Sequence, residues 1–67
     1  MHIYINDEYV DLGCEEICVA ELIELRRLPK GGTAVAVNDR LIPKSRHNDF
    51  FLHEGDKVLL ISAAFGG

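Results

Sequence analysis

The chain has 67 residues and a formal net charge of −4 at pH 7, which leaves room for one domain with one core. Apolar residues make up 48% of it, a share that is normal for a globular domain and too high for a disordered one. The acidic balance disfavours binding to nucleic acid or to anionic membranes, which both need a basic face. No apolar stretch approaches the roughly 20 residues of a membrane span, and the start resembles no signal peptide. We therefore expect a soluble, cytoplasmic protein.

The first elements in chain order form a predicted β-hairpin. The stretch MHIYIN carries an apolar residue at every second position, which is typical of a half-buried strand. The stretch EYVDL alternates apolar with acidic residues in the same way. Asn6 and Asp7 are turn formers and lie between the two stretches. Two alternating stretches separated by a short turn predict a hairpin.

The next stretch, GCEEICVAELIELRRLPKGG, changes to a helical period and predicts one helix. Cys18 stands where a capping Ser or Thr is expected, and Glu21 follows three residues later, which is a weak form of the capping box. Acidic residues precede the helix and the basic residues of RRLPK close it, an order that suits the helix dipole. Pro29 and the two glycines after it then end the helix.

The second half of the chain predicts a further hairpin and a last strand. In TAVAVNDRLIP, a strand over 34–37 and one over 41–42 flank the turn formers Asn38 and Asp39. The stretch KSRHNDFFLHEGD is irregular, and one of Phe50, Phe51 or Leu52 is available to fill the core. The apolar run in KVLLIS suits a central strand, either buried on both faces or with an apolar patch on one of them.

This order of elements predicts an α+β fold in which one main helix covers one face of a mixed sheet of four to five strands. A helical crossover separates the first strand from the last, so these two can pair in parallel at the centre of the sheet. The arrangement is the β-grasp fold of ubiquitin. The opposite face of the sheet stays open for a partner.

Strict alternation along the strands predicts which side chains face each way. Tyr4, Leu59 and Ile61 point away from the helix and would form an exposed apolar patch that a partner binds. A small basic group near the second hairpin is either solvated surface or a group that steers an acidic partner; it comprises Arg40, Lys44 and Arg46. Nine apolar side chains are expected in the core: Ile3, Ile5, Val19, Leu22, Val35, Val37, Leu52, Val58 and Leu60.

Metal and redox chemistry find little support in the sequence. Cys14 and Cys18 lie four residues apart and are expected to be free thiols. A structural zinc site needs four ligands, and the scattered His2, His47 and His53 supply no second pair. The sequence therefore predicts no metal site and places the three histidines at the surface. No arrangement of a catalytic triad or of paired carboxylates stands out, which disfavours an enzyme.

Three motifs together resemble the ThiS family of bacterial sulfur carriers in thiamine thiazole synthesis: VNDRLIPKSR, EGDKVLLI and the final Gly66-Gly67. The first residues, MHIYIND, are similar as well, and the resemblance spans the whole chain. Two positions depart from the family pattern. Cys18 stands where Thr or Ser is common, and His47 stands where Trp is common. Neither departure affects the last residues.

The resemblance implies that the carboxylate of Gly67 is the reactive group. An α-carboxyl is ionised at pH 7 and is a poor electrophile until it is activated. By resemblance, an E1-like adenylyltransferase of the ThiF type adenylates it with ATP, and sulfur then replaces AMP to give a thiocarboxylate. A thiazole synthase of the ThiG type receives the sulfur. The chain itself is then a protein co-substrate that binds no cofactor, acts as no enzyme and is monomeric alone.

The resemblance divides the chain into a β-grasp domain over 1–62 and a flexible C-terminal tail over 63–67. At roughly 3.3–3.6 Å per residue the tail reaches at most about 17 Å, enough to enter a partner's active site. Ala64 and Gly66 are small enough to thread a narrow channel. Phe65 either docks in a partner pocket or packs back on the domain. With Leu59 and Ile61, these three residues are the predicted partner contacts.

Three alternatives stay open at this point. A sulfur carrier of the MoaD type, the small subunit of molybdopterin synthase, uses the same chemistry but usually has a longer chain and often Pro-Ser before Gly-Gly. A ubiquitin-like modifier would be joined to lysines through Gly67. A plain interaction domain would have an inert tail.

Overall fold

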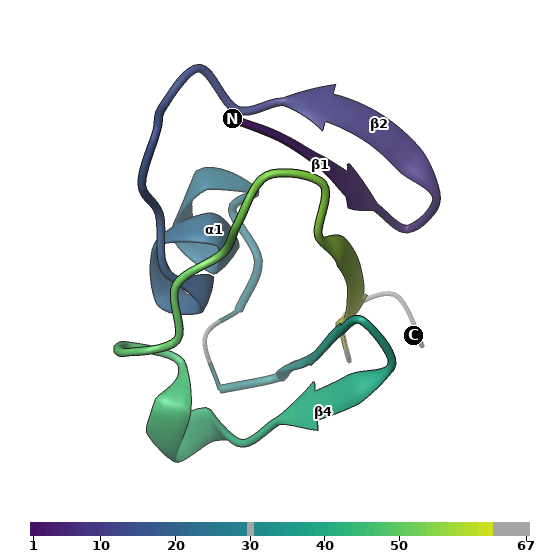
Figure 1. The fold of residues 1–67 in the computed structure, drawn as a ribbon. Helices are drawn as coiled ribbons and strands as arrows, with labels where there is room; N and C mark the ends of the chain where they lie inside the picture. Colours follow the sequence, from purple (N-terminus) through teal and green to yellow (C-terminus); the bar gives the residue numbers. More distant parts are fainter. Residues whose placement is uncertain (30, 63–67) are drawn as a thin grey trace.

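The structure is a computed structural model that describes residues 1–29 and 31–62. These residues form one mixed sheet, one α-helix and one short 3₁₀ helix (Figure 1). No helix in this part of the chain is both long and apolar enough to cross a membrane. The elements in chain order are β1 (His2–Ile5), β2 (Glu8–Asp11), α1 (Val19–Leu25), β3 (Thr33–Val37), β4 (Arg40–Ile42), η1 (Lys44–Arg46) and β5 (Lys57–Ser62).

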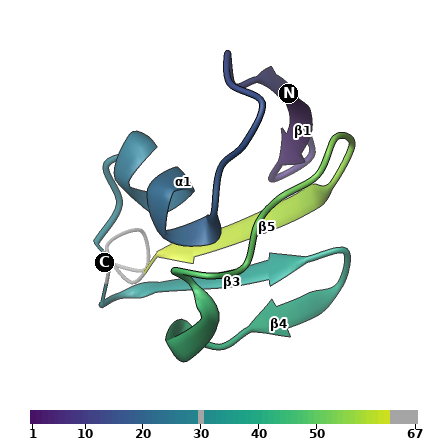
Figure 2. The same cartoon turned by 60° about the vertical axis from the view of Figure 1, so that its left-hand side comes forward.

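The last strand lies at the centre of the sheet, whose strand order is β2-β1-β5-β3-β4. β5 pairs in parallel with β1 and antiparallel with β3. The helix α1 lies across one face of this sheet, and the other face carries no helix (Figure 2). The predicted β-grasp fold and the predicted parallel pairing of the first and last strands are therefore confirmed.

Two tight turns of the same kind close the two hairpins. Asn6 and Asp7 adopt φ of 49° and 69°, and Asn38 and Asp39 adopt 51° and 69°. Two successive left-handed residues match the right-handed twist of the flanking strands, and asparagine and aspartate tolerate this conformation better than other side chains. The Asn-Asp pairs thus fix the register of both hairpins.

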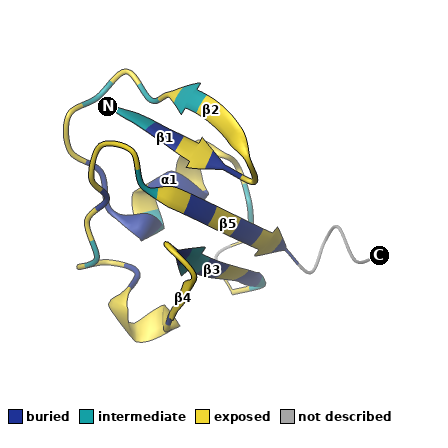
Figure 3. Ribbon diagram, turned by 45° about the vertical axis from the view of Figure 1, so that its right-hand side comes forward, coloured by how far each residue is buried: buried dark blue, intermediate teal, exposed yellow. Residues whose placement is uncertain are grey.

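The core lies between α1 and the sheet and includes all nine predicted residues. β5 decides between the two interpretations of its sequence: Val58 and Leu60 are buried, whereas Leu59 and Ile61 are exposed (Figure 3). Of the three candidates to fill the core after η1, Leu52 is buried. The buried apolar cluster comprises Ile3, Ile5, Ile17, Val19, Leu22, Ile23, Val35, Val37, Ile42, Leu52, Val58 and Leu60.

The helix begins as predicted at the capping position of Cys18, whose backbone is extended (φ −96°, ψ 168°). The carboxylate of Glu21 accepts a hydrogen bond from the Cys18 N–H at 3.0 Å. This bond satisfies one of the backbone donors that the first turn leaves without an intrahelical partner. It favours the charged carboxylate and so lowers the pKa of Glu21 below its usual 4.5.

This cap predicts an acid-dependent contribution to stability. The pKa of Glu21 is lower in the folded state, so its contribution is present above about pH 4.5 and is lost as pH falls through the lowered value. Glu21→Gln keeps an acceptor oxygen but does not titrate. We expect the parent to have a higher free energy of unfolding than Glu21→Gln at about pH 6. This difference, measured by urea unfolding, should become smaller as the pH is lowered to about 3. An unchanged difference would contradict the assignment.

The predicted end of the helix is wrong by several residues. The helix stops at Leu25, with Arg26 at its C-cap and no basic residue in its last turn. Arg27 takes a left-handed conformation (φ 57°), and the Leu28 N–H bonds back to the Ile23 carbonyl at 3.0 Å. This pattern closes a helix early by satisfying its last carbonyls. The basic residues after it therefore lie beyond the last turn.

The prediction that all three histidines lie at the surface is wrong for His47, which is 6% exposed. Its Nε2 lies 3.0 Å from the Ile42 carbonyl, and its own carbonyl accepts the Ala20 N–H at 2.8 Å. The chain folds back after β4 and brings the ring against the sheet edge. His53 is exposed and His2 is half-buried.

Candidate functional site

The face of the sheet opposite α1 carries a row of exposed apolar and aromatic side chains. Tyr4 of β1 and Leu59 and Ile61 of β5 lie there as predicted, and Leu59 and Ile61 are 46% and 57% exposed. Tyr9 of β2 and Leu41 of β4 lie on the same face, because residues directly opposite each other in a sheet point to the same side: Tyr9 lies opposite Tyr4, and Leu41 lies opposite Ala36, which in turn lies opposite Leu59. We call this surface the open face.

Two alanines keep the centre of the open face shallow. Ala34 lies opposite Ile61, and Ala36 lies opposite both Leu59 and Leu41. Small side chains on β3 leave the larger ones on its neighbours accessible from above. An exposed apolar surface that spans several strands is a candidate contact site for a partner.

The β1–β2 end of the open face has a polar rim. The rings of Tyr9 and His2 stack at 5.2 Å, and Tyr4 lies 5.0 Å from Tyr9 at a tilt of 52°. His2 Nε2 lies 3.5 Å from Asp11 Oδ2. The Gly13 N–H, which donates to Asp11 at 2.9 Å, and the nearby His2 together hold the pKa of Asp11 below its usual value. The open face thus passes from aliphatic at β5 to aromatic and charged at β2.

The end of β5 is held firmly in the sheet. Ser62 is the last described residue, is 2% exposed and lies opposite Thr33 of β3. The predicted site residues Ala64, Phe65, Gly66 and Gly67 lie outside the described residues. The structure therefore places Leu59 and Ile61 together on one strand and fixes the point from which the chain continues.

Asn6 anchors the second half of β5, which sequence reasoning missed. Its Oδ1 accepts the Leu60 N–H at 2.9 Å, and its Nδ2 donates to the Leu60 carbonyl at 3.3 Å. The Asn6 N–H also donates to the Val58 carbonyl at 2.9 Å. The side-chain amide thus continues the β1–β5 ladder after β1 has turned away. The sequence signal was present, since an asparagine amide can mimic a peptide group, but it was interpreted only as a turn.

Replacing this amide should loosen the strand. We expect Asn6→Ala to lower the free energy of unfolding by about 1–3 kcal/mol, because two hydrogen bonds and a favourable left-handed residue are lost. Urea unfolding measures the change. Asn48→Ala, at an exposed asparagine, is the matched control and should stay within about 0.5 kcal/mol of the parent. Equal effects of the two substitutions would show that the amide does not hold β5.

Metal-ligating side chains are not gathered in the described part of the chain. Within residues 1–29 and 31–62, no three His, Cys, Asp or Glu side chains form a group that could hold a metal ion. Cys14 is half-buried and Cys18 is buried, and both are free thiols, as predicted. A cavity of about 270 Å³ opens beside Tyr4, Lys57 and Leu59 at the turn end of the open face. It belongs to the same surface.

The sheet order and the uncovered face define a small protein of the ubiquitin-like β-grasp class. The chain belongs to the ThiS family, whose model matches residues 3–67. It is 28% identical to sulfur carrier protein ThiS of Escherichia coli (strain K12) over 67 residues, covering 100% of both chains. The crystal structure of thiamine biosynthesis protein ThiS from Geobacter metallireducens has a TM-score of 0.84 and 19% identity, covering 92% of this chain and 93% of that one. At this identity, the structural likeness supports the fold.

Proposed function

We propose that this chain, a sulfur carrier protein of the ThiS family, carries its sulfur on the carboxyl group of Gly67 and delivers it to the thiazole of thiamine. Family membership over residues 3–67 is the observation that carries the proposal. The chain is then the substrate of its partners rather than a catalyst. We place it in the cytoplasm, where thiols such as Cys14 and Cys18 stay reduced.

The chemistry needs no catalytic side chain in this protein. A carboxylate oxygen of Gly67 attacks the α-phosphorus of ATP, and pyrophosphate leaves. A sulfur nucleophile at the oxidation level of hydrosulfide then attacks the acyl carbon and loses its proton, and AMP leaves with the electrons of the broken C–O bond. The product is a thiocarboxylate, whose sulfur is the nucleophile in the next reaction. The ATP is bound and used by the activating partner, so this chain needs no cofactor of its own.

The position of β5 supports a role in which the folded domain presents its C-terminal residues to a partner that does the chemistry. The strand is central, paired on both sides, and held near its end by Thr33 and Asn6. Gly67 follows Ser62 by five positions, a span of at most about 17 Å. Small residues at positions 64 and 66 would let this tail enter an active site while the folded domain stays outside. Phe65 would contact the partner at the mouth of that site.

The open face is the proposed docking surface for both partners, an adenylyltransferase of the ThiF type and a thiazole synthase of the ThiG type. Leu59 and Ile61 lie on the strand that leads to the tail. A partner that binds these two side chains would therefore also set the direction in which the tail leaves the domain. The domain alone would be monomeric. The complex with each partner would cover the apolar side chains of the open face.

A charge on this face should prevent docking. We expect Leu59→Asp to slow activation of the carrier by about tenfold or more, because a carboxylate would be buried without a partner in the interface. Leu25→Asp is the matched control, since Leu25 is similarly exposed but lies on α1, away from the open face. The initial rate of ATP-dependent thiocarboxylate formation measures both. Equal loss in the two variants would contradict docking through this face.

Intact mass after incubation with the cognate activating enzyme, ATP and a sulfur donor tests the proposal. The expected product is heavier by the exchange of one oxygen for one sulfur. Isopeptide conjugates to lysines would identify a modifier instead, and an unchanged mass would point to an interaction domain. The MoaD alternative is tested by adding the product to thiazole synthase and, separately, to the large subunit of molybdopterin synthase. Turnover by the second enzyme alone would overturn the thiamine assignment.

A further inference from the structure

The sheet edge formed by β4 carries a hollow of about 350 Å³. The pairing of β3 with β4 reaches only from Val37 back to Val35, which lies opposite Ile42. Pro43 then directs the chain into η1 and away from the sheet. Residues 31–34 therefore have no β4 residue beside them, and the hollow lies in this gap. Its lining includes Gly31 and Ala34 on one side of the gap and Leu41, Pro43 and Lys44 on the other.

Apolar side chains dominate one wall of the hollow. Leu41 is 72% exposed, more than any other large apolar side chain in the described part of the protein. Pro43 is exposed beside it, and Ala34 lies across the gap on β3. A leucine this exposed contributes little to the core, and with Pro43 and Ala34 it forms an apolar wall that is open to contact from outside the domain.

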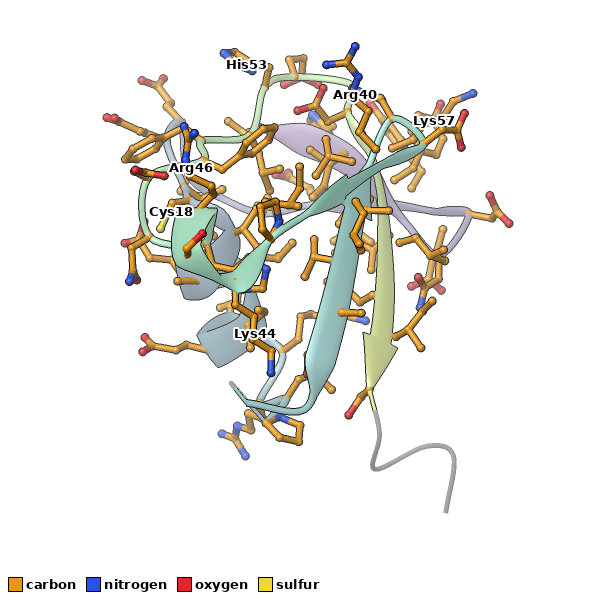
Figure 4. The ribbon with its side chains drawn as sticks, turned by 90° about the horizontal axis from the view of Figure 1, so that it is seen from below. Cys18, Arg40, Lys44, Arg46, His53 and Lys57 are labelled. Atoms are coloured by element: carbon orange, nitrogen blue, oxygen red, sulfur yellow. The ribbon has the colours of Figure 1, made fainter. Side chains whose placement is uncertain are left out.

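Positive charge lies at the rim of this hollow and beside it, although the protein is acidic. The segment 40–46, RLIPKSR, holds three of the seven Lys and Arg residues and no carboxylate, in a chain of net charge −4. Seen from this edge, Arg40, Lys44 and Arg46 are spread around β4 and η1 (Figure 4). Arg46 pairs with Asp49 at 2.9 Å, and Lys44 donates to the Gly31 carbonyl at the rim of the hollow. Among the described residues, no carboxylate pairs with Arg40 or Lys44.

We propose that the hollow docks an acidic segment of a partner protein, with one apolar or aromatic side chain between Leu41 and Pro43 and a carboxylate on Lys44, while Arg40 adds to the positive charge of this edge. The complementarity of charge favours this occupant. A locally basic edge on an acidic protein attracts an acidic surface in one orientation and repels others. The net negative charge disfavours nucleic acid at the same place. The site extends the open face past β4, and it does not depend on the chemistry proposed for Gly67.

Peptide titration tests the proposal on the full chain. Three acetylated, amidated peptides serve as probes, EEFEE, EEGEE and KKFKK, added to isotope-labelled protein while amide shifts are recorded by NMR. We expect EEFEE to give saturable shifts confined to residues 31–34 and 40–47, at an affinity about fivefold weaker in high salt. EEGEE should bind more weakly, and KKFKK should not bind. Shifts elsewhere, no saturation, or equal binding of KKFKK would overturn the proposal.

Two pairs of variants separate the apolar and the charged contributions. Leu41→Ala and Lys44→Glu should each weaken EEFEE binding by about fivefold or more. Leu25→Ala and Arg26→Glu, at exposed positions on and after α1, are the matched controls and should bind as the parent does. Because Lys44 also contacts Gly31, Arg40→Glu repeats the charge test at a position outside the lining. Full affinity in Leu41→Ala would overturn the proposed apolar contact.

Other occupants give different outcomes. If the protein's own residues 63–67 filled the hollow, their deletion would shift the amides of 31–34 and 40–47 and strengthen peptide binding. If a second copy filled it, the same amides would shift with protein concentration. Either result would overturn the proposal. None of these measurements uses the activating enzyme, so failure here and failure of thiocarboxylate formation are separate results.

Discussion

Deletion of Gly66 and Gly67 is expected to abolish thiocarboxylate formation and to leave the domain folded. The described contacts of β5 end at Ser62, which pairs with Thr33 in the sheet. The deletion begins several residues later, so the core loses nothing that the structure describes. The new terminus on Phe65 still ends in a carboxylate, but it lies two residues, about 7 Å, short of the original one. It also carries a benzyl side chain where the parent has no side chain.

The measurement combines intact mass with thermal unfolding. The shortened protein should show no gain of sulfur under conditions that convert the parent completely, and its melting temperature should match that of the parent. Gly67→Ala is the matched control, because it keeps the length and the terminal carboxylate and adds one methyl group. We expect it to be activated more slowly than the parent but not to be inert. Normal sulfur loading of the shortened protein would show that the carboxyl group of Gly67 is not the site that carries the sulfur.

Sequence patterns predicted the strands of this fold well because each strand has a simple physical constraint. In β5, the alternation of side chains along a strand places Val58 and Leu60 on one face and Leu59 and Ile61 on the other, and this needs no knowledge of the neighbouring strands. The hairpins were predictable because Asn-Asp pairs suit left-handed turns. The end of the helix was not predictable, because arginine seldom adopts the positive φ that Arg27 has here. Pro29, which the sequence offers as the signal that ends the helix, lies further along the chain.

Two other features depend on contacts between residues distant in sequence. η1 folds back against the helix, so that the His47 carbonyl accepts the Ala20 N–H and the His47 ring is buried, and no local pattern encodes that position. The role of Asn6 depends on Leu60, which is far away along the chain. On the open face, Tyr4, Leu59 and Ile61 were predictable from the alternation along β1 and β5. Tyr9 and Leu41 are placed beside them only by the pairing of β2 with β1 and of β4 with β3.

Leu22→Ala is expected to have the largest effect on stability. Leu22 is 0% exposed and lies on the face of α1 that packs against the sheet. Truncation removes most of a buried side chain and leaves a cavity, which costs about 2–5 kcal/mol. A domain of this length has a free energy of unfolding of about 3–10 kcal/mol. The variant should therefore lose a large share of its stability and unfold far more readily on heating.

Leu25→Ala is the control on the same helix, because Leu25 is 56% exposed. It should stay within about 0.5 kcal/mol of the parent in urea unfolding, since little apolar area leaves the core. The pair tests the orientation of α1, because a helix turned on its axis would exchange the two results. It also tests how the carrier depends on its core. Below the unfolding temperature of Leu22→Ala, the folded fraction should still acquire sulfur at the parent's rate, since Leu22 lies in the core, on the side of the sheet opposite the open face. A rate that falls faster than the folded fraction would show that α1 positions β5 for its partner.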